Sequence, residues 1–234
     1  MKRVLLPLLL LTMHFCGCSA PDSRSDENRD GETGPQPIRV AVIPKSTSHQ
    51  FWMAVHAGAR RAAAELEGVE IIWKGPQVES DTAGQISLVK NFITKRVDGI
   101  CLAPSHSEAL VDVVVEASDE GVPVVVFDSG LGAGAEFVSY VATDNFNGGR
   151  LAAERMAEVL GEKGDVILLR YRAGSESTEQ REAGFLEAIK AYPAINVLSS
   201  DQYAEATTES AMKKAQSLLL KYQEEVDGIF AVNE

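Results

Sequence analysis

Residues 98–128 read DGICLAPSHSEALVDVVVEASDEGVPVVVFD and decide the fold. Two short apolar runs rich in β-branched residues, 98–104 and 122–128, enclose a longer segment that mixes apolar and charged residues. Continuous apolar runs of this length are typical of strands that are buried on both faces of a parallel sheet. A strand, a helix and a second parallel strand form the repeating unit of α/β proteins.

The same alternation extends in both directions along the chain. Short apolar runs predict strands at 38–44, 69–75, 98–104, 122–128, 139–144, 165–171, 195–203 and 226–234. Residues 128–136 join two of these strands without a helix, and a new strand–helix series starts at Asp144. We therefore expect an α/β fold of two doubly wound parallel-sheet domains around a cleft, with domains at 38–142 and 143–234. A single continuous sheet is the alternative.

The predicted helices carry two finer expectations. An apolar stripe in the helix predicted at 51–68 should face the sheet and contains Phe51, Val55, Ala59, Ala62 and Leu66. Ser105 and Ser177 each begin an S-x-x-E or S-x-x-Q pattern, which predicts a capping box at a helix start. The last predicted strand, 226–234, has no crossover helix after it, so we expect the second domain to be incomplete at its C-terminal side.

Composition excludes several classes of protein. The 234 residues are 45% hydrophobic and 24% charged, which is typical of a globular chain. The formal net charge of −12 argues against a nucleic-acid-binding protein, which needs a basic surface for the phosphates. Three cysteines exclude a disulfide-rich scaffold.

The N-terminal segment predicts export. Lys2 and Arg3 precede the apolar run 4–13, which is too short to span a bilayer and fits the core of a signal peptide. The junction Gly17-Cys18 resembles a bacterial lipobox, so residues 1–18 are interpreted as a lipoprotein signal with lipidation at Cys18. The alternative is an ordinary signal peptide that is cleaved after Ala20. Residues 19–37 lack large apolar side chains and predict a flexible tether.

Candidate binding residues lie where the predicted strands end, because ligands of open parallel sheets bind at the carboxyl ends of the strands. His49, Phe51 and Trp52 follow the first strand. Two adjacent aromatic residues on a helix cannot both face the core, so one of them could present its ring to the apolar face of a sugar. The alternative places Phe51 in the core and Trp52 at a packed edge.

Polar candidates follow the other strands. Asp128, before Ser129, ends the fourth strand and could accept hydrogen bonds from two sugar hydroxyls, or alternatively from its own turn. Arg181 near a helix start suggests a polar partner, the alternative being a surface ion pair with Glu179 or Glu182. Asn233 ends the last strand with an amide that can donate and accept.

No motif predicts a metal, a cofactor or an enzyme. The four histidines, His14, His49, His56 and His106, are too scattered to indicate a metal site. The glycines of 130–134 lead into a strand and not into a helix, so they do not form a pyrophosphate site. The chain also lacks a P-loop, a nucleophile elbow and an H-E-x-x-H pattern.

Several ordered segments resemble one known family. The segments VAVIPKSTSHQFWMAVHAGARRAAAEL, VDGICLAPS, GVPVVVFDSG, YVATDNFNGGRLAAERM, REAGFLEAI and VDGIFAVNE are similar to the periplasmic sugar-binding proteins of ABC importers, of the ribose-binding type. The similarity runs from about residue 38 to residue 234 and implies the fold called periplasmic binding protein type I. The ligand-binding half of lactose-repressor-like regulators shares this fold.

The resemblance implies roles for individual residues. His49, Phe51 and Trp52 match the loop that brackets the sugar, and Asp128, Arg181 and Asn233 match its polar ligands. Ser129 stands where the ribose-binding type has Arg, and His49 where relatives commonly have Asn. These departures argue against ribose itself and leave another sugar or a polyol as the ligand.

We therefore expect a monomeric, exported and lipid-anchored sugar-binding protein, located in the periplasm or cell envelope, that delivers its ligand to an ABC permease. Neither a cofactor nor a nucleic acid is expected. The alternative is an extracytoplasmic sensor of a sugar or a quorum signal that docks on a histidine kinase, because one fold supports many functions. An α/β enzyme is a more distant alternative.

Overall fold

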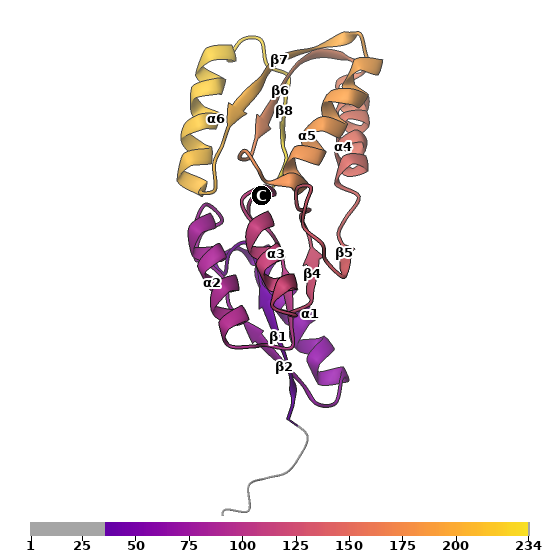
Figure 1. Cartoon of the computed structure of the whole chain (residues 1–234). Helices are drawn as coiled ribbons and strands as arrows, with labels where there is room; N and C mark the ends of the chain where they lie inside the picture. Colours follow the sequence, from indigo (N-terminus) through magenta and orange to yellow (C-terminus); the bar gives the residue numbers. More distant parts are fainter. Residues whose placement is uncertain (1–35, 234) are drawn as a thin grey trace, which may run out of the picture. The chain divides into compact units, whose positions relative to one another are not determined.

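The computed structural model of the chain describes residues 36–233. The predicted signal segment with Cys18, and most of the predicted tether, lie outside the described residues. Within residues 36–233, strands and helices alternate along the chain (Figure 1), and each predicted strand overlaps an observed one. The predicted α/β fold with parallel sheets is therefore confirmed.

The first sheet has five parallel strands in the order β2-β1-β3-β4-β5. Their residues are mostly β-branched and form the runs that were predicted from sequence. The strands are β1 (Ile38–Ile43), β2 (Val69–Trp73), β3 (Gly99–Leu102), β4 (Val124–Phe127) and β5 (Ser139–Val141).

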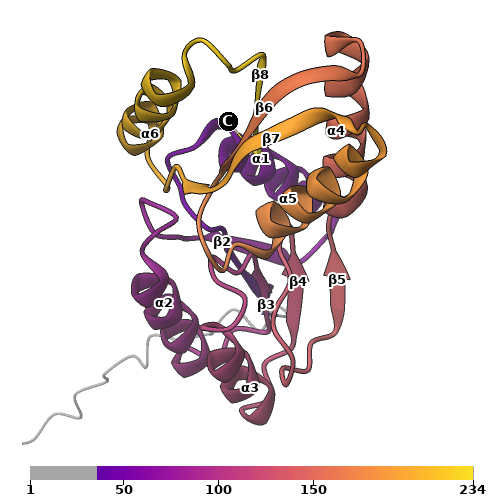
Figure 2. The ribbon, with the colours of Figure 1, turned by 90° about the horizontal axis from the view of Figure 1, so that it is seen from above.

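Helices cover both faces of this sheet (Figure 2). Helices α2 (Thr82–Thr94) and α3 (Val111–Asp119) lie on one face, and α1 (Gln50–Glu65) lies on the other. The buried side chains of α2 and α3, such as Phe92 and Val114, pack on those of β1, β3 and β4, such as Ile43, Ile100 and Val126. This apolar layer holds the carboxyl ends of the strands in place.

The second sheet has three parallel strands in the order β7-β6-β8. They are β6 (Lys163–Arg170), β7 (Ala194–Tyr203) and β8 (Gly228–Ala231). On one face lie α4 (Asn145–Leu160) and α5 (Glu176–Ala188), followed by a short 3-10 helix η1 (Ile189–Ala191), and on the other lies α6 (Thr208–Tyr222) (Figure 2). Between the two sheets the chain runs from the end of β5 at Val141 to Asn145. The domain boundary near residue 142 stays a prediction.

The inward face of α1 differs from the predicted stripe. Trp52 is 2% exposed, whereas Phe51 is 45% and Leu66 56% exposed. The face toward the sheet passes through Trp52 and His56, whose ring stacks on Trp73 of β2 at a centroid distance of 4.5 Å. Val55 and Ala59 of the predicted stripe are half-buried, as His56 is, whereas Phe51, Ala62 and Leu66 are exposed. The observed inward face therefore keeps the middle of the predicted stripe and begins at Trp52 in place of Phe51.

Both predicted capping boxes are wrong. Helix α3 begins at Val111 and α5 at Glu176, and neither N-cap side chain bonds to the helix backbone. The Ser105 amide donates to Gln85 Oε1 at 2.9 Å, and Ser177 Oγ accepts from the Lys45 ammonium at 3.0 Å. These serines therefore make contacts between elements instead of local caps.

Helices α4 and α5 approach each other closely through two glycines. A Cβ atom on Gly149 of α4 would overlap the carbonyl oxygen of Arg181, and one on Gly184 of α5 would overlap that of Phe146. Because backbone atoms of both helices fill these positions, no side chain fits there. The contact also sets the position of the Arg181 backbone. None of the helices within residues 36–233 is long and apolar enough to span a membrane.

We expect two neighbouring glycines of α4 to respond oppositely to alanine. Gly149→Ala should lower the free energy of unfolding by about 2 kcal/mol, because the new methyl group overlaps the α5 backbone. Gly148→Ala is the matched control: its Cβ meets no atom, so it should raise the free energy by up to about 1 kcal/mol. Urea denaturation of the two variants measures both effects. Equal effects would contradict the described helix contact.

Candidate functional site

The strand-end loops of both sheets meet at a small cavity of about 50 Å³. This is room for a few water molecules and too little for a sugar ring. Five of the residues predicted from sequence line it, namely Phe51, Trp52, Asp128, Arg181 and Asn233. The other lining residues are Lys45, Glu79, Tyr171, Ser175, Ser177 and Thr178.

Asp128 lies directly after β4 in a left-handed backbone conformation, with φ of 65°. Aspartate tolerates this conformation better than most residues, although it carries some strain. Its amide donates to the Val141 carbonyl at 2.9 Å, which ties the turn to β5. Its Oδ2 lies 3.1 Å from the Lys45 ammonium, and both side chains are largely shielded from water. Asp128 is therefore held by its partner as well as by its turn.

Lys45 is the most buried cation of the site, at 3% exposed. Its ammonium donates to Ser175 Oγ at 3.3 Å and to Ser177 Oγ at 3.0 Å, and it pairs with Asp128. An ammonium has three N–H donors, so these three partners satisfy it completely. Lys45 follows β1, whereas both serines belong to the start of α5, so one side chain joins the two sheet-bearing parts.

The two aromatic residues of α1 have different environments. Trp52 is buried, and its indole N–H donates to Glu79 Oε1 at 2.6 Å. Phe51 packs edge-on against Trp52 at a centroid distance of 4.8 Å and keeps much of its own ring exposed. The sequence alternative with Phe51 in the core is wrong. Both rings line the cavity, and Phe51 has the more accessible face.

Arg181 reaches the cavity from the first half of α5. Its Nε donates to Asn145 Oδ1 at 2.9 Å, and its Nη1 donates to the Val232 carbonyl at 2.9 Å. Within residues 36–233 both of these partners are neutral. Among the described residues the alternative, an ion pair with Glu179 or Glu182, is not formed: Glu179 Oε1 accepts from the Gly174 amide at 2.7 Å, and Glu182 pairs with Arg170 at 2.6 Å. The side chain of Arg181 lines the cavity without an ion pair among these residues.

His49 and Ser129 lie outside the small cavity. His49 is the N-cap residue of α1 and lines a neighbouring cavity of about 190 Å³, which Tyr171 and Asn233 also line. Ser129 is fully buried, and its Oγ accepts a hydrogen bond from the Ser177 amide at 3.0 Å. The predicted ligand contacts of these two residues stay predictions.

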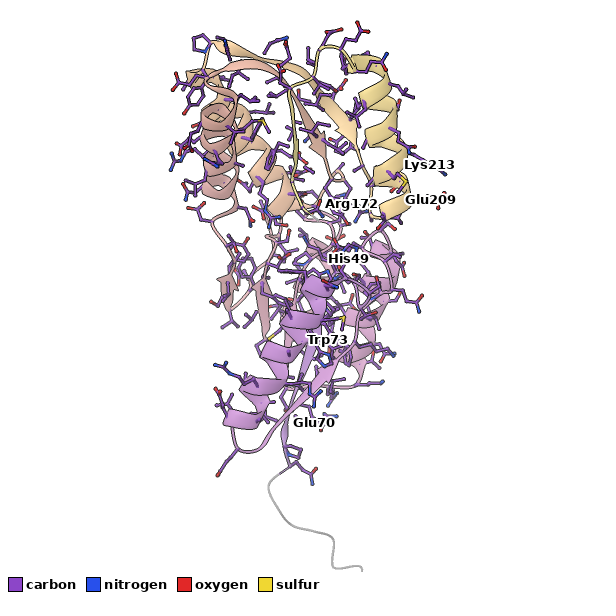
Figure 3. The ribbon with its side chains drawn as sticks, turned by 180° about the vertical axis from the view of Figure 1, so that it is seen from behind. His49, Glu70, Trp73, Arg172, Glu209 and Lys213 are labelled. Atoms are coloured by element: carbon purple, nitrogen blue, oxygen red, sulfur yellow. The ribbon has the colours of Figure 1, made fainter. Side chains whose placement is uncertain are left out.

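Further hydrogen bonds cross between the loops of the two sheets. Arg172 Nη1 donates to the carbonyl oxygens of Glu79, at 2.7 Å, and Ser105, at 3.2 Å. The Gly130 amide donates to Glu176 Oε2 at 2.8 Å. Figure 3 shows Arg172 and His49 in the region where the two sheet-bearing parts meet. The cavity is thus bordered by a polar network with buried members.

Burial and nearby acids keep two phenols protonated. Burial, the Glu176 carboxylate and Asp128 raise the pKa of Tyr140 to about 12. Burial and the Glu79 carboxylate raise the pKa of Tyr171 far above its usual value. Both tyrosines are therefore hydrogen-bond donors at neutral pH.

Burial also raises the pKa of the Glu182 carboxyl, whereas its hydrogen bond and ion pair with Arg170 act in the opposite direction.

The charges around the cavity balance. Among the described lining residues, the cations Lys45 and Arg181 offset the acids Glu79 and Asp128. Within residues 36–233 no group of three or more His, Cys, Asp or Glu side chains could hold a metal ion. Donors, acceptors and aromatic faces without excess charge suit a neutral, polyhydroxylated ligand.

Comparison with protein families identifies the fold. The model of the periplasmic binding protein domain matches residues 40–234. This chain belongs to that family. A curated member is the D-ribose/D-allose-binding protein of Pseudomonas aeruginosa, which is 33% identical over 197 residues, covering 82% of this chain and 61% of the relative.

Solved structures agree with this family. An ABC transporter solute-binding protein from Agrobacterium vitis with bound D-fucose is 34% identical, with a TM-score of 0.78 over 82% of this chain and 66% of its own. A periplasmic solute-binding protein from Actinobacillus succinogenes with bound D-allose is 33% identical, with a TM-score of 0.76 over 85% and 70%. The resemblance to sugar-binding proteins of ABC importers is confirmed, and these relatives are binding proteins rather than enzymes.

The chain spans only part of these family members. It covers 61% of the Pseudomonas aeruginosa protein and 64% of a ribose import binding protein of Haemophilus influenzae, which is 29% identical. The family is periplasmic, which agrees with the export predicted from the N-terminal segment.

Sequence reasoning missed the residues that complete the site. Lys45 lies two residues after β1, and Tyr171 directly follows β6. Both obey the strand-end rule, which could have found them. Glu79 lies in the loop between β2 and α2, where nothing local distinguishes it from the exposed acids nearby.

We expect Lys45 and Asp128 to be strongly coupled in stability. Lys45→Met or Asp128→Asn should each lower the free energy of unfolding by about 3 kcal/mol, because the remaining charge is buried without its partner. Asparagine keeps the tolerance for positive φ at this position. The double variant should recover a large part of the loss.

The exposed pair Arg61–Glu65 is the control for this cycle. Its atoms lie 3.1 Å apart in solvent, and Arg61→Met should change the free energy of unfolding by no more than about 0.5 kcal/mol. Denaturant titrations of the four proteins measure the coupling. If the double variant loses the sum of the two single losses, the Lys45–Asp128 pair is not a coupled unit.

Proposed function

We propose that this protein is an extracytoplasmic solute-binding protein that captures a sugar between its two α/β domains, 38–142 and 143–234, and delivers it to an ABC permease. One observation carries the proposal: Asp128 from the first sheet and Arg181 from α5 line the same cavity as Phe51 and Trp52. A carboxylate and a guanidinium can each bond two neighbouring hydroxyls, and an aromatic ring suits the apolar face of a sugar.

The related proteins support this ligand class. Those named above bind D-ribose or D-allose, or were solved with D-fucose or D-allose bound. The balanced charges of the cavity favour a neutral sugar over a phosphate ester. His49, Ser129 and Asn233 complete the proposed ligand set, with Ser129 acting through the turn that also carries Asp128.

The small volume of the cavity implies movement during binding. A sugar ring needs more space than about 50 Å³, so the loops of the two sheets have to separate before it enters. A ligand that contacts groups from both parts then stabilises the arrangement in which all contacts exist together. Such a ligand-dependent arrangement is what a permease would recognise. In this proposal the protein acts as a monomer and is attached to the membrane by a lipid on Cys18.

Sugar binding is tested by a thermal-shift screen with D-ribose, D-allose, D-fucose and xylitol, followed by calorimetric titration. A specific sugar should raise the melting temperature. Arg181→Ala should weaken its binding by about tenfold or more, because a buried hydroxyl loses its partner. Arg155→Ala is the control, since Arg155 is exposed on α4 and pairs with Glu158. Equal affinities of the parent and Arg181→Ala would contradict the proposed site.

Lipid attachment is tested separately in cells. Cys18→Ser should abolish labelling by a radioactive fatty acid and release the protein from the membrane fraction. Cys16→Ser, two residues away, is the matched control and should stay labelled. Labelling that persists in Cys18→Ser would favour the ordinary signal peptide.

A further inference from the structure

Glu79 is a buried acid whose two oxygens have different partners. It lies in the loop between β2 and α2. Its Oε1 accepts from the Trp52 indole N–H at 2.6 Å, and its Oε2 accepts from the Tyr171 hydroxyl at 2.9 Å. Trp52 belongs to α1 beside the first sheet, and Tyr171 follows β6 of the second sheet. One carboxylate therefore connects an aromatic wall of the cavity to the opposite part of the molecule.

Both donors depend on this carboxylate. Trp52 and Tyr171 are buried, and an indole N–H can only donate. Without Glu79 each buried donor would lose its described partner, which is costly in a protein interior. The Trp52 ring also contacts Phe51 and Phe127 edge-on, at centroid distances of 4.8 and 6.2 Å. Packing on these rings and the bond to Glu79 together set the orientation of the indole.

The backbone of Glu79 makes a second contact with the same opposite segment. Its carbonyl oxygen accepts from Arg172 Nη1 at 2.7 Å. Two consecutive residues of the second part, Tyr171 and Arg172, thus hold the side chain and the backbone of one residue of the first part. The Tyr171 hydroxyl stays a donor at all ordinary pH values, because burial and Glu79 raise its pKa.

We propose that Glu79 is a positioning residue of the sugar site: it orients the Trp52 indole and ties it to Tyr171, so that the aromatic wall is set when the two sheet-bearing parts meet. This inference rests on the proposed function. Glu79 also lines the cavity, and the role proposed for it is to hold Trp52, because each of its oxygens already accepts from a buried protein donor. In variants of Glu79 itself, ligand affinity and indole orientation should then change together.

The test reads Trp52 directly. The chain has two tryptophans, Trp52 and Trp73, and a Trp73→Phe background leaves Trp52 as the only indole emitter (Figure 3 labels Trp73). In that background Glu79→Ala should shift the Trp52 emission to longer wavelength and increase its quenching by iodide. It should also weaken binding of the best sugar from the screen by about tenfold or more.

Two further variants separate positioning from general stability. Glu79→Gln keeps an oxygen for the Trp52 N–H, and the Tyr171 hydroxyl can accept from its amide. The emission wavelength of Trp52 should therefore stay as in the parent, and the affinity for the sugar should stay within about threefold of the parent. Tyr171→Phe removes the tie between the Glu79 side chain and the second part and leaves the Arg172 bond to the Glu79 carbonyl: affinity should fall while the emission of Trp52 stays unchanged. Glu70→Ala is the matched control, an exposed glutamate on β2 (Figure 3), and should change neither readout.

The outcomes distinguish this inference from the proposed function. If the parent binds sugar and Glu79→Ala binds equally well, the inference is overturned and the proposed function stands. If no sugar binds the parent, the proposed function fails, and the emission of Trp52 alone decides whether Glu79 orients the indole. Should Glu79→Ala not fold, the two other variants decide: an unchanged affinity of Tyr171→Phe, or an altered emission of Glu79→Gln with unchanged affinity, would overturn the inference.

Discussion

Parallel pairing of the strands is the constraint on which the site depends. Every strand pair within residues 36–233 is parallel, so the carboxyl ends of each sheet collect at one edge. The loops after β1 and β4 supply Lys45 and Asp128, and those after β6 and β8 supply Tyr171 and Asn233. Apolar layers on the α2–α3 face of the first sheet and on both faces of the second sheet hold the strands, which leaves the loops free to carry polar groups.

Burial then dictates how these polar groups are paired. Lys45 has three donors and three partners, and Glu79 has two oxygens and two buried donors. Unpaired buried groups are costly, so such a network is stable only when it is complete. Lys45 and Glu79, which bond the proposed sugar ligands Asp128 and Trp52, therefore also join the two sheet-bearing parts. A sugar hydroxyl that binds Asp128 has to take a place in this network, where it exchanges protein partners for ligand partners with little net loss of hydrogen bonds.

The strands could be predicted from sequence, because an apolar run buried on both faces is a local signal. Helix faces and caps were less predictable. Trp52 takes the inward position and not Phe51, since its indole finds an acceptor in Glu79, which is 27 positions away. Ser177 bonds Lys45 across 132 positions instead of capping α5. Single-sequence patterns report neighbours along the chain, and these partners are neighbours only after folding.

The candidate site divides along the same line. Asp128, Arg181, Phe51, Trp52 and Asn233 stand at strand ends or helix starts, where topology alone indicates a ligand-facing position, and all five line the cavity. Glu79 and Ser175 gain their roles from contacts with residues that are distant along the chain. The sequence therefore indicates which side chains each sheet carries at its strand ends. Which of these side chains bond to one another across the two parts can be seen only in the folded structure.

Arg181 shows how the fold connects recognition to the segment between the sheets. Its backbone lies against Gly149 of α4, and its Nε bonds Asn145 Oδ1. Asn145 is buried and donates in turn to the Thr143 carbonyl at 3.1 Å, within the connection from β5 to α4. The position of the guanidinium is thus fixed by the segment that links the two parts, and not only by its own helix. One amide side chain therefore connects the guanidinium that lines the cavity to the segment between the two sheets.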